Sequence, residues 1–350
     1  MNKKFNILFV DDEVNGNRKG LIANINYDER FNVTEYHPVD AIEDLDKGLI
    51  EDKYALIIVD YKLSHEPNRN NVSCHSNGYS LTSLFKEKLP NTPVYLISQI
   101  LTDDISMGEH YDKMFSHSFL TSEKGRDLLA YDCEDHQQLL KEARNLNSFE
   151  KICEFLMVPN ECKDAFKVAL PIEFRKGLSN NLDNNSSQVL DKERSFIRFA
   201  KWINQIFLLK SGPLIDELEV AVLFGLDYEY FKTNFRKEYE SDLMACEYKG
   251  IFAKTNEKKW WSQAVFDFAV SLADEDYISY PWKVVPKKLN VEEKFLSKCA
   301  LCQENTPECT AFDRDETEGN TKYAAHWSCT VAAEDQVDLA GFNPVLYLDD

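Results

Sequence analysis

Short apolar runs that alternate with segments of helical spacing constrain the fold of this chain more than any other feature. Four runs of strand length stand within the first 100 residues, at 6–10, 31–37, 54–59 and 92–100. The segments that separate them, 17–26, 39–50 and 78–89, show the spacing of single helices. Parallel neighbouring strands need crossover connections of this kind, and apolar runs such as YALIIVD are typical of strands buried on both faces. The pattern therefore predicts an α/β domain with an open parallel sheet covered by helices on both faces.

Polar side chains mark the carboxyl ends of three of these runs. Asp11 and Asp12 follow the first run, Asp60 follows the third, and Ser98 lies at the end of the fourth. Because the carboxyl ends of parallel strands meet at one edge of a sheet, we expect these four side chains to share a pocket. Three carboxylates repel one another unless a hard cation neutralises them, and Mg²⁺ prefers such oxygen ligands. Asp is also a common turn residue at strand ends, so the prediction depends on all four residues matching the strand pattern.

In this order and spacing, the segments ILFVDDE, IIVDYKL and VYLIS resemble the receiver domain of two-component response regulators. The resemblance covers about residues 1–125 and implies a doubly wound, five-stranded, flavodoxin-like domain. It also implies that Asp60 accepts a phosphoryl group from a histidine-kinase-like partner, and that Ser98 turns toward this group after transfer. An aspartate held against a metal ion is chemically suited to such a transfer.

The resemblance further implies a magnesium site and a nearby cation. By this resemblance, Asp11, Asp12 and Asp60 are expected to bind Mg²⁺, together with the backbone carbonyl of Lys62. Receivers also carry a Lys at the end of the fifth strand, commonly followed by Pro. The nearest candidate here is Lys124, which stands a few residues late and lacks the Pro.

Two other features depart from the usual receiver pattern. The connection over 61–77 is longer than the tight loop typical of the family, so we expect it to cover the site or to bind a partner. The aromatic residue nearest to the usual switch position in the fifth strand is Phe119.

The region from 128 to 290 has mainly helical spacing. Apolar residues recur at helical intervals over 194–210, 214–226 and 264–272, which indicates buried helix faces rather than a cofactor site. The segment 248–261 has the pattern of a hairpin with a basic tip, and helices followed by such a hairpin are compatible with a winged-helix-like unit. The polar stretch 179–187 is expected to be a loop or linker.

Three cysteines and one histidine near the carboxyl end have the spacing of a zinc site. Cys299 and Cys302 form one pair, and His326 and Cys329 form a second pair after 23 intervening residues. Such a set suits a closed, tetrahedral, structural Zn²⁺ site, and the spacing resembles LIM-type and treble-clef fingers. The other interpretation is a group of reduced cysteines with an unrelated His, and Cys309 is either an alternative ligand or a loop thiol.

Charge and missing motifs exclude several functions. The formal net charge of −20 opposes the phosphate backbone, which argues against nucleic-acid binding by the surface as a whole. The chain has no apolar stretch long enough to cross a bilayer and no signal-peptide pattern, so we expect it in the cytoplasm. It contains no phosphate-binding loop, dinucleotide fingerprint, nucleophile elbow or HExxH motif, so we expect no enzymatic activity.

These observations predict three domains: a receiver over 1–127, a mainly helical domain over 128–290 and a zinc-binding module over 291–350. The predicted function is signalling. Phosphorylation of Asp60 would change how the carboxyl-terminal region contacts an unknown protein partner, for instance in a bacterial phage-defence or stress system that receivers with long loops resemble. The alternative is a transcription regulator that binds DNA through the winged-helix-like unit.

Overall fold

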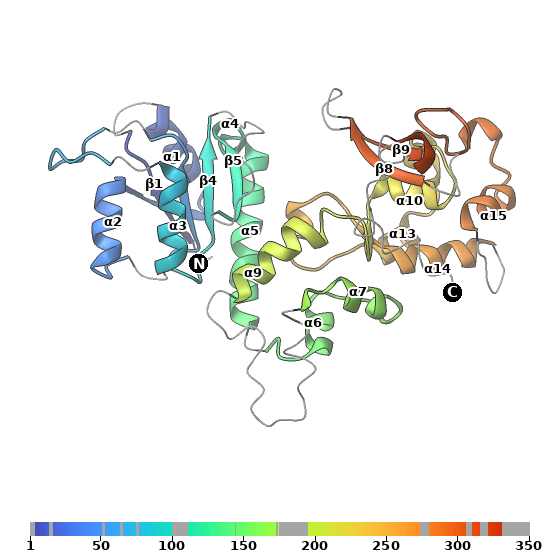
Figure 1. Cartoon of the computed structure of the whole chain (residues 1–350), viewed down its shortest axis with the longest axis horizontal. Helices are drawn as coiled ribbons and strands as arrows, with labels where there is room; N and C mark the ends of the chain where they lie inside the picture. Colours follow the sequence, from blue (N-terminus) through green and yellow to red (C-terminus); the bar gives the residue numbers. More distant parts are fainter. Residues whose placement is uncertain are drawn as a thin grey trace. The chain divides into compact units, whose positions relative to one another are not determined.

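The chain forms two compact units in the computed structural model (Figure 1). The first unit comprises Met1–Ser148 and Gly177–Ile203, and the second comprises Phe149–Lys176 and Asn204–Asp350. No helix in the described part of the chain combines the length and apolar character that crossing a bilayer requires. The described residues are 4–13, 17–50, 53–63, 66–74, 77–99, 111–143, 145–172, 174, 195–273, 280–305, 310–315 and 321–330.

A five-stranded parallel sheet forms the centre of the first unit, in the order β2-β1-β3-β4-β5. This is the flavodoxin-like order, in which the winding reverses between β1 and β3. The first four strands lie where the apolar runs predicted them, which confirms the α/β fold class. The strands are Phe5–Val10 (β1), Phe31–Tyr36 (β2), Leu56–Asp60 (β3), Val94–Ser98 (β4) and Lys113–Ser116 (β5).

Two apolar cores fill the space between this sheet and its helices. Alternate residues of a strand point to opposite faces, so Leu8 enters the core under α2 and α3, whereas Phe9 enters the core under α1 and α5. The predicted helices over 17–26, 39–50 and 78–89 are present with small shifts at their ends. The helices are Asn17–Tyr27 (α1), Pro38–Asp46 (α2), Gly78–Lys88 (α3), His117–Thr121 (α4), Glu123–Glu142 (α5) and Ser195–Trp202 (α9).

Helix α5 runs through the domain boundary that we expected at residue 127. Its apolar residues Leu129, Ala130 and Cys133 belong to the same core as α1. The helical spacing that begins near residue 128 in the sequence is therefore the second half of a receiver helix, and the first unit extends to Ser148.

Short helices build most of the second unit around one core, which includes Phe224, Phe231, Trp260 and Val265. Two one-turn π-helical segments, Ile203–Phe207 (η2) and Phe231–Phe235 (η3), interrupt the helical regions. The α-helices are Phe149–Phe155 (α6), Lys163–Ala169 (α7), Glu217–Leu223 (α10), Tyr228–Tyr230 (α11), Arg236–Glu238 (α12), Glu240–Cys246 (α13), Ser262–Ala273 (α14) and Pro281–Lys288 (α15).

The segment 214–226 is only partly helical, in contrast to its predicted spacing. Leu214–Ile215 (β6) pairs antiparallel with Trp260–Trp261 (β7), and α10 begins after Asp216. The reason is a capping box: the Asp216 side chain accepts a hydrogen bond from the Glu219 backbone, and the Glu219 side chain accepts one from the Asp216 backbone.

The predicted chain reversal over 248–261 is present. The backbone N–H of Tyr248 donates to the carbonyl of Lys259 at 2.8 Å, and Glu247 pairs with Trp260. The turn between them contains a 3₁₀ segment, Ala253–Thr255 (η4), rather than a tight hairpin loop.

An antiparallel hairpin lies near the carboxyl end of the second unit. Its strands are Thr310–Asp315 (β8) and Thr321–His326 (β9), and the 3₁₀ turn Trp327–Cys329 (η6) follows directly. Cys309 and the polar stretch 179–187 lie outside the described residues.

Candidate functional site

The strand register brings the predicted acidic residues together at the carboxyl edge of the sheet. Val10 pairs with Val59, so Asp11 and Asp60 follow at adjacent positions of neighbouring strands. Asp60 pairs with Ile97, and Ser98 is the next residue of β4. Asp11, Asp12 and Asp60 are 3% exposed or less, and Ser98 is 8% exposed. Three buried carboxylates at one edge are a donor set that suits a hard cation.

Close packing against α3 fixes the backbone at Asp60. A Cβ atom placed on Gly78 would lie 1.8 Å from the carbonyl oxygen of Asp60, so only glycine fits where α3 begins. The Gly78 N–H donates to the carbonyl of Tyr61 at 3.2 Å, and the Tyr61 N–H donates to Ile97 at 2.9 Å. Lys62, whose carbonyl we expected to bind Mg²⁺, follows with an exposed side chain.

His117 lies near Asp60, and the sequence analysis did not identify it as a site residue. It directly follows β5, and Ser116 of that strand pairs with Ser98. The Nε2 atom of His117 lies 3.5 Å from Oδ1 of Asp60, and the side chain is 17% exposed. The available signal was its place directly after a strand, but all four residues of β5 are only half-buried, so no apolar run marked the strand.

Lys124 lies elsewhere in the first unit. Strand β5 ends at Ser116, whereas Lys124 stands eight residues later in the first turn of α5, with an exposed side chain. The position directly after the fifth strand is occupied by His117 instead.

The described part of the long connection after Asp60 contacts α2. Asn68 donates from Nδ2 to Asp40 Oδ1 at 2.6 Å, and a ring nitrogen of His37 lies 2.9 Å from the carbonyl of Glu66. Leu63 and Cys74 are both buried in the core under α2 and α3. The described residues of this connection are thus attached to α2 beside the carboxyl edge.

The Cys and His residues predicted to bind zinc come together in the second unit. One ligand atom from each of Cys299, Cys302, His326 and Cys329 lies within 4.8 Å of all the others. Tetrahedral Zn²⁺ with bonds of about 2.3 Å places sulfur ligands about 3.8 Å apart, so a small contraction fits this set to the ion.

Hydrogen bonds around His326 select the ring nitrogen that faces the cluster. Its Nε2 lies 2.9 Å from the carbonyl oxygen of Asn305, which only accepts, so Nε2 carries the proton and donates. Nδ1 lies 3.2 Å from Cys302 Sγ and is left as the candidate metal ligand. Although burial raises the pKa of the Cys299 thiol, the backbone N–H groups of Cys302, His326 and Leu301 lower it to about 6.

The hairpin that carries His326 is tied to α10 by an ion pair. Lys322 Nζ on β9 lies 2.6 Å from Asp216 Oδ2 and 3.3 Å from Glu219 Oε1. Burial raises the pKa of Asp216, but Lys322 and Lys259 outweigh this effect and hold it below its ordinary value. The hairpin that carries His326 is thus anchored to the capping box of α10.

Among the comparisons with known proteins, similarity is found to solved structures. No family model matches the chain, and no curated protein matches it. Solved structures that are similar include NtrX from Brucella abortus (22% identity, 41% of this chain and 30% of that chain, TM-score 0.32). Others are a CheY-like response regulator receiver domain protein from Methanospirillum hungatei JF-1 (16% identity, 40% and 99%, TM-score 0.29) and the receiver domain of a signal transduction histidine kinase from Syntrophus aciditrophicus (16% identity, 39% and 92%, TM-score 0.28).

The first unit has the receiver fold, as its strand order and helix placement define it. The match to NtrX spans about a third of the length of that protein and 41% of this chain. A Cys/His cluster near the carboxyl end accompanies this fold.

Proposed function

We propose that this chain is a phosphoryl-accepting signalling protein, in which Asp60 takes the phosphoryl group from a histidine-kinase-like partner. One observation carries the proposal: Asp11, Asp12 and Asp60 are buried side by side at the carboxyl edge of a flavodoxin-like sheet, with the Ser98 hydroxyl on the next strand. Burying three carboxylates beside one another carries a large desolvation cost, and a bound cation is a common way for a protein to offset that cost.

Asp11, Asp12 and Asp60, with the carbonyl of Lys62, are the groups that would hold Mg²⁺. When bound, the ion supplies positive charge that offsets the phosphoryl oxygens. The chain's own residues would supply the rest: Asp60 would be the nucleophile, with its backbone packed against Gly78, and the Ser98 hydroxyl on the next strand would donate to the group once it is attached.

The Cys/His cluster is proposed to hold a structural Zn²⁺ ion. Four protein ligands leave no open coordination position, which favours a structural role over a catalytic one. Through Lys322 and Asp216, the ion would stabilise the hairpin against α10, and so help to define a surface that contacts an output partner.

A second candidate function, DNA binding, is favoured by the strand order in the second unit. Strand β6 comes first, α10 to α13 follow, and two paired segments around Tyr248 and Trp260 come last, with β6 pairing with the final one. This is the order of a winged-helix-like unit.

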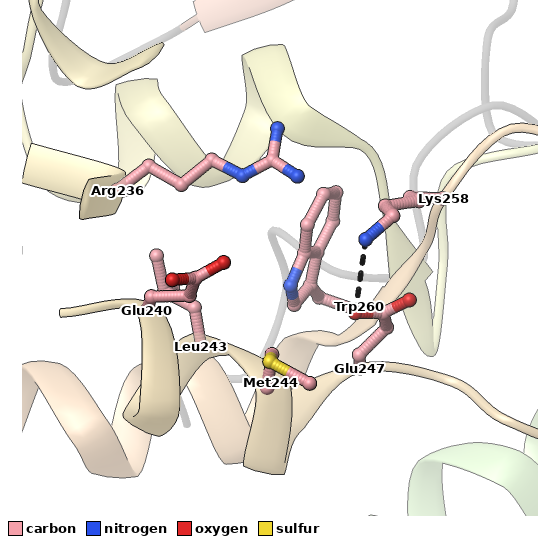
Figure 2. A pocket seen from close by; sticks show the side chains of 7 residues that line it. All are labelled: Arg236, Glu240, Leu243, Met244, Glu247, Lys258 and Trp260. Atoms are coloured by element: carbon pink, nitrogen blue, oxygen red, sulfur yellow. Dashed lines mark hydrogen bonds and ion pairs between the residues drawn. The ribbon is translucent and has the colours of Figure 1, made fainter. Parts of the chain in front are cut away.

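The charges beside α12 and α13 favour a protein partner over DNA. A hollow between α12–α13 and the paired segments is lined by two acids and two bases over an apolar floor (Figure 2). Arg236 is paired with Glu217, and Lys258 Nζ lies 3.5 Å from Glu247 Oε2. A phosphate backbone would meet neutralised bases here. We expect no salt-dependent shift with a random-sequence DNA duplex, and a clear shift at low salt would favour the second candidate.

The mass of the intact protein tests the main proposal. The full chain is incubated with Mg²⁺ and acetyl phosphate, beside Asp60→Asn, which removes the nucleophile but keeps the side-chain shape. The native chain is expected to gain one phosphoryl mass, and Asp60→Asn none. No gain by the native chain, with or without a histidine-kinase extract from the source cells, would contradict the proposal.

A further inference from the structure

A ring nitrogen of His117 faces the carboxylate of Asp60 at a distance too long for a good hydrogen bond. The separation from Nε2 to Oδ1 is 3.5 Å, and Nε2 is buried without a hydrogen bond to any described residue. A carboxylate oxygen only accepts, so the favourable arrangement has the proton on Nε2, pointing toward Asp60. The geometry thus presents one buried N–H group beside the acceptor.

Hydrogen bonds at the start of α4 hold His117 in this position. Ser116 is the N-cap of the helix, and its side chain accepts a hydrogen bond from the Phe119 N–H at 3.1 Å. Phe115 and Phe119, which flank His117 in the sequence, stack their rings with centroids 5.4 Å apart. The backbone of His117, which carries the imidazole, is therefore fixed before any ligand binds.

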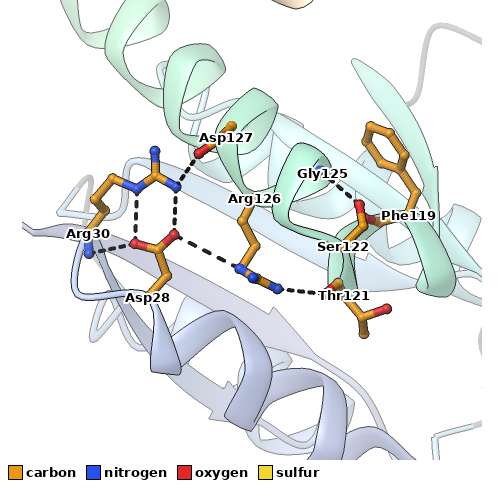
Figure 3. A network of polar contacts seen from close by, with 8 residues as sticks. All are labelled: Asp28, Arg30, Phe119, Thr121, Ser122, Gly125, Arg126 and Asp127. Carbon is orange, nitrogen blue, oxygen red and sulfur yellow. Dashed lines mark hydrogen bonds and ion pairs between the residues drawn. The ribbon is translucent and has the colours of Figure 1, made fainter.

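The corner between α4 and α5 adds further rigidity (Figure 3). The Gly125 N–H donates to Ser122 Oγ at 2.9 Å, and a Cβ at Gly125 would lie 1.9 Å from the Phe119 carbonyl oxygen. Arg126 donates to the Thr121 carbonyl at 2.5 Å and lies 4.0 Å from Asp28. These contacts lock the short helix that carries His117 onto α5.

We propose that His117 is a catalytic residue of the phosphoacceptor site. Its imidazole N–H would balance the negative charge of the phosphoryl oxygens during transfer, the role that the resemblance to receivers assigns to a lysine. This inference rests on the proposed function of Asp60. In the transfer, an Asp60 oxygen forms a bond to phosphorus, and the bond from phosphorus to the donor atom breaks; this atom is an imidazole nitrogen in a phosphohistidine and an oxygen in acetyl phosphate. The leaving group keeps the bonding electron pair. His117 keeps its proton and donates a hydrogen bond from Nε2 to a phosphoryl oxygen.

With His117 in this role, the site would not require Lys124. The exposed first turn of α5 holds Lys124 in solvent, whereas His117 directly follows β5. A single donor aimed at developing phosphoryl charge contributes on the order of a hundredfold in rate in comparable sites.

The test compares four variants of the full chain in acetyl phosphate with Mg²⁺. They are His117→Ala, His117→Lys, Lys124→Ala and Ser118→Ala, of which the last is an exposed neighbour on the same helical turn. The readouts are the rate of phosphoryl mass gain and the thermal stabilisation by fluoroberyllate, which reports binding without group transfer. Circular dichroism checks that each variant is folded.

We expect His117→Ala to slow mass gain on the order of a hundredfold and to weaken fluoroberyllate binding. His117→Lys should restore most of the rate, which a purely structural role would not explain, and Ser118→Ala should match the native chain. Native rates in His117→Ala, or a loss in Lys124→Ala alone, would overturn the inference while leaving Asp60 as acceptor. No mass gain in the native chain would overturn the proposed function and this inference together.

Discussion

Adding one methyl group at Gly78 should displace the backbone of Asp60, the proposed phosphoacceptor. The Cβ of Gly78→Ala would lie 1.8 Å from the Asp60 carbonyl oxygen, 2.7 Å from its carbonyl carbon and 2.9 Å from the Tyr61 Cα. Ordinary contacts of a Cβ begin at 3.4 Å, so backbone atoms must move by about 1.5 Å. All three neighbours are backbone atoms, and no side chain can rotate away.

We expect Gly78→Ala to lower the free energy of unfolding by about 3 kcal/mol. Phosphoryl uptake by the folded fraction should fall on the order of a hundredfold, because a displacement of about 1 Å in a reacting group has that effect. Gly20→Ala is the matched control: Gly20 lies inside α1, and a Cβ added there would meet no atom within 4 Å, so the same change should stabilise the chain by about 1 kcal/mol.

Urea unfolding followed by circular dichroism gives the two free energies, and the mass of the intact protein gives the uptake rate. The two alanine variants should therefore shift the unfolding midpoint in opposite directions. Equal midpoints for Gly78→Ala and Gly20→Ala, with native uptake in both, would refute the close contact between α3 and Asp60.

Three further predictions concern His136, Lys322 and Cys302. Burial lowers the pKa of His136 from 6.5 to about 4, so its stabilising contribution is complete above pH 6.5 and is lost toward pH 4. The free energy of unfolding measured in urea should be about 2 kcal/mol lower at pH 5 than at pH 7.5. The variant His136→Gln should remove most of that difference. Lys322→Met removes the ion-pair partner that lies 2.6 Å from Asp216, and it should lower the free energy of unfolding measured by thermal denaturation by about 2 kcal/mol. Lys294→Met, which removes an exposed ion pair, should change this free energy little. Equal effects of the two variants would refute the anchoring of the hairpin. Cys302→Ser should lower the zinc content measured by elemental analysis, and an unchanged content would contradict its role as a ligand.

The sequence predicted the parts of the fold that carry a strong hydrophobic signal. Strands β1, β3 and β4 are buried almost throughout, so their apolar runs stood out, and the acids after β1 and β3 could be aligned with them. The Cys/His cluster was equally visible, because metal ligands at short spacing leave a local pattern.

The parts that the sequence did not predict lack such local signals. Strand β5 is half-buried, so His117 was hidden after it, and a positive charge directed attention to Lys124. Strand β6 is two residues long and is defined by pairing with Trp260–Trp261, which lies far along the chain. The boundary expected at residue 127 was misplaced because α5 has the same helical spacing as the segments that follow it.

The most direct test of Asp60 as the acceptor is to locate the phosphoryl group on the chain. After incubation with acetyl phosphate and Mg²⁺, borohydride reduces an aspartyl phosphate to homoserine, and tandem mass spectrometry of peptides identifies the residue changed. We predict homoserine at position 60 alone, and no change when phosphoryl donor or Mg²⁺ is omitted. Homoserine at another aspartate, or none at position 60 while the intact chain gains phosphoryl mass, would contradict this assignment.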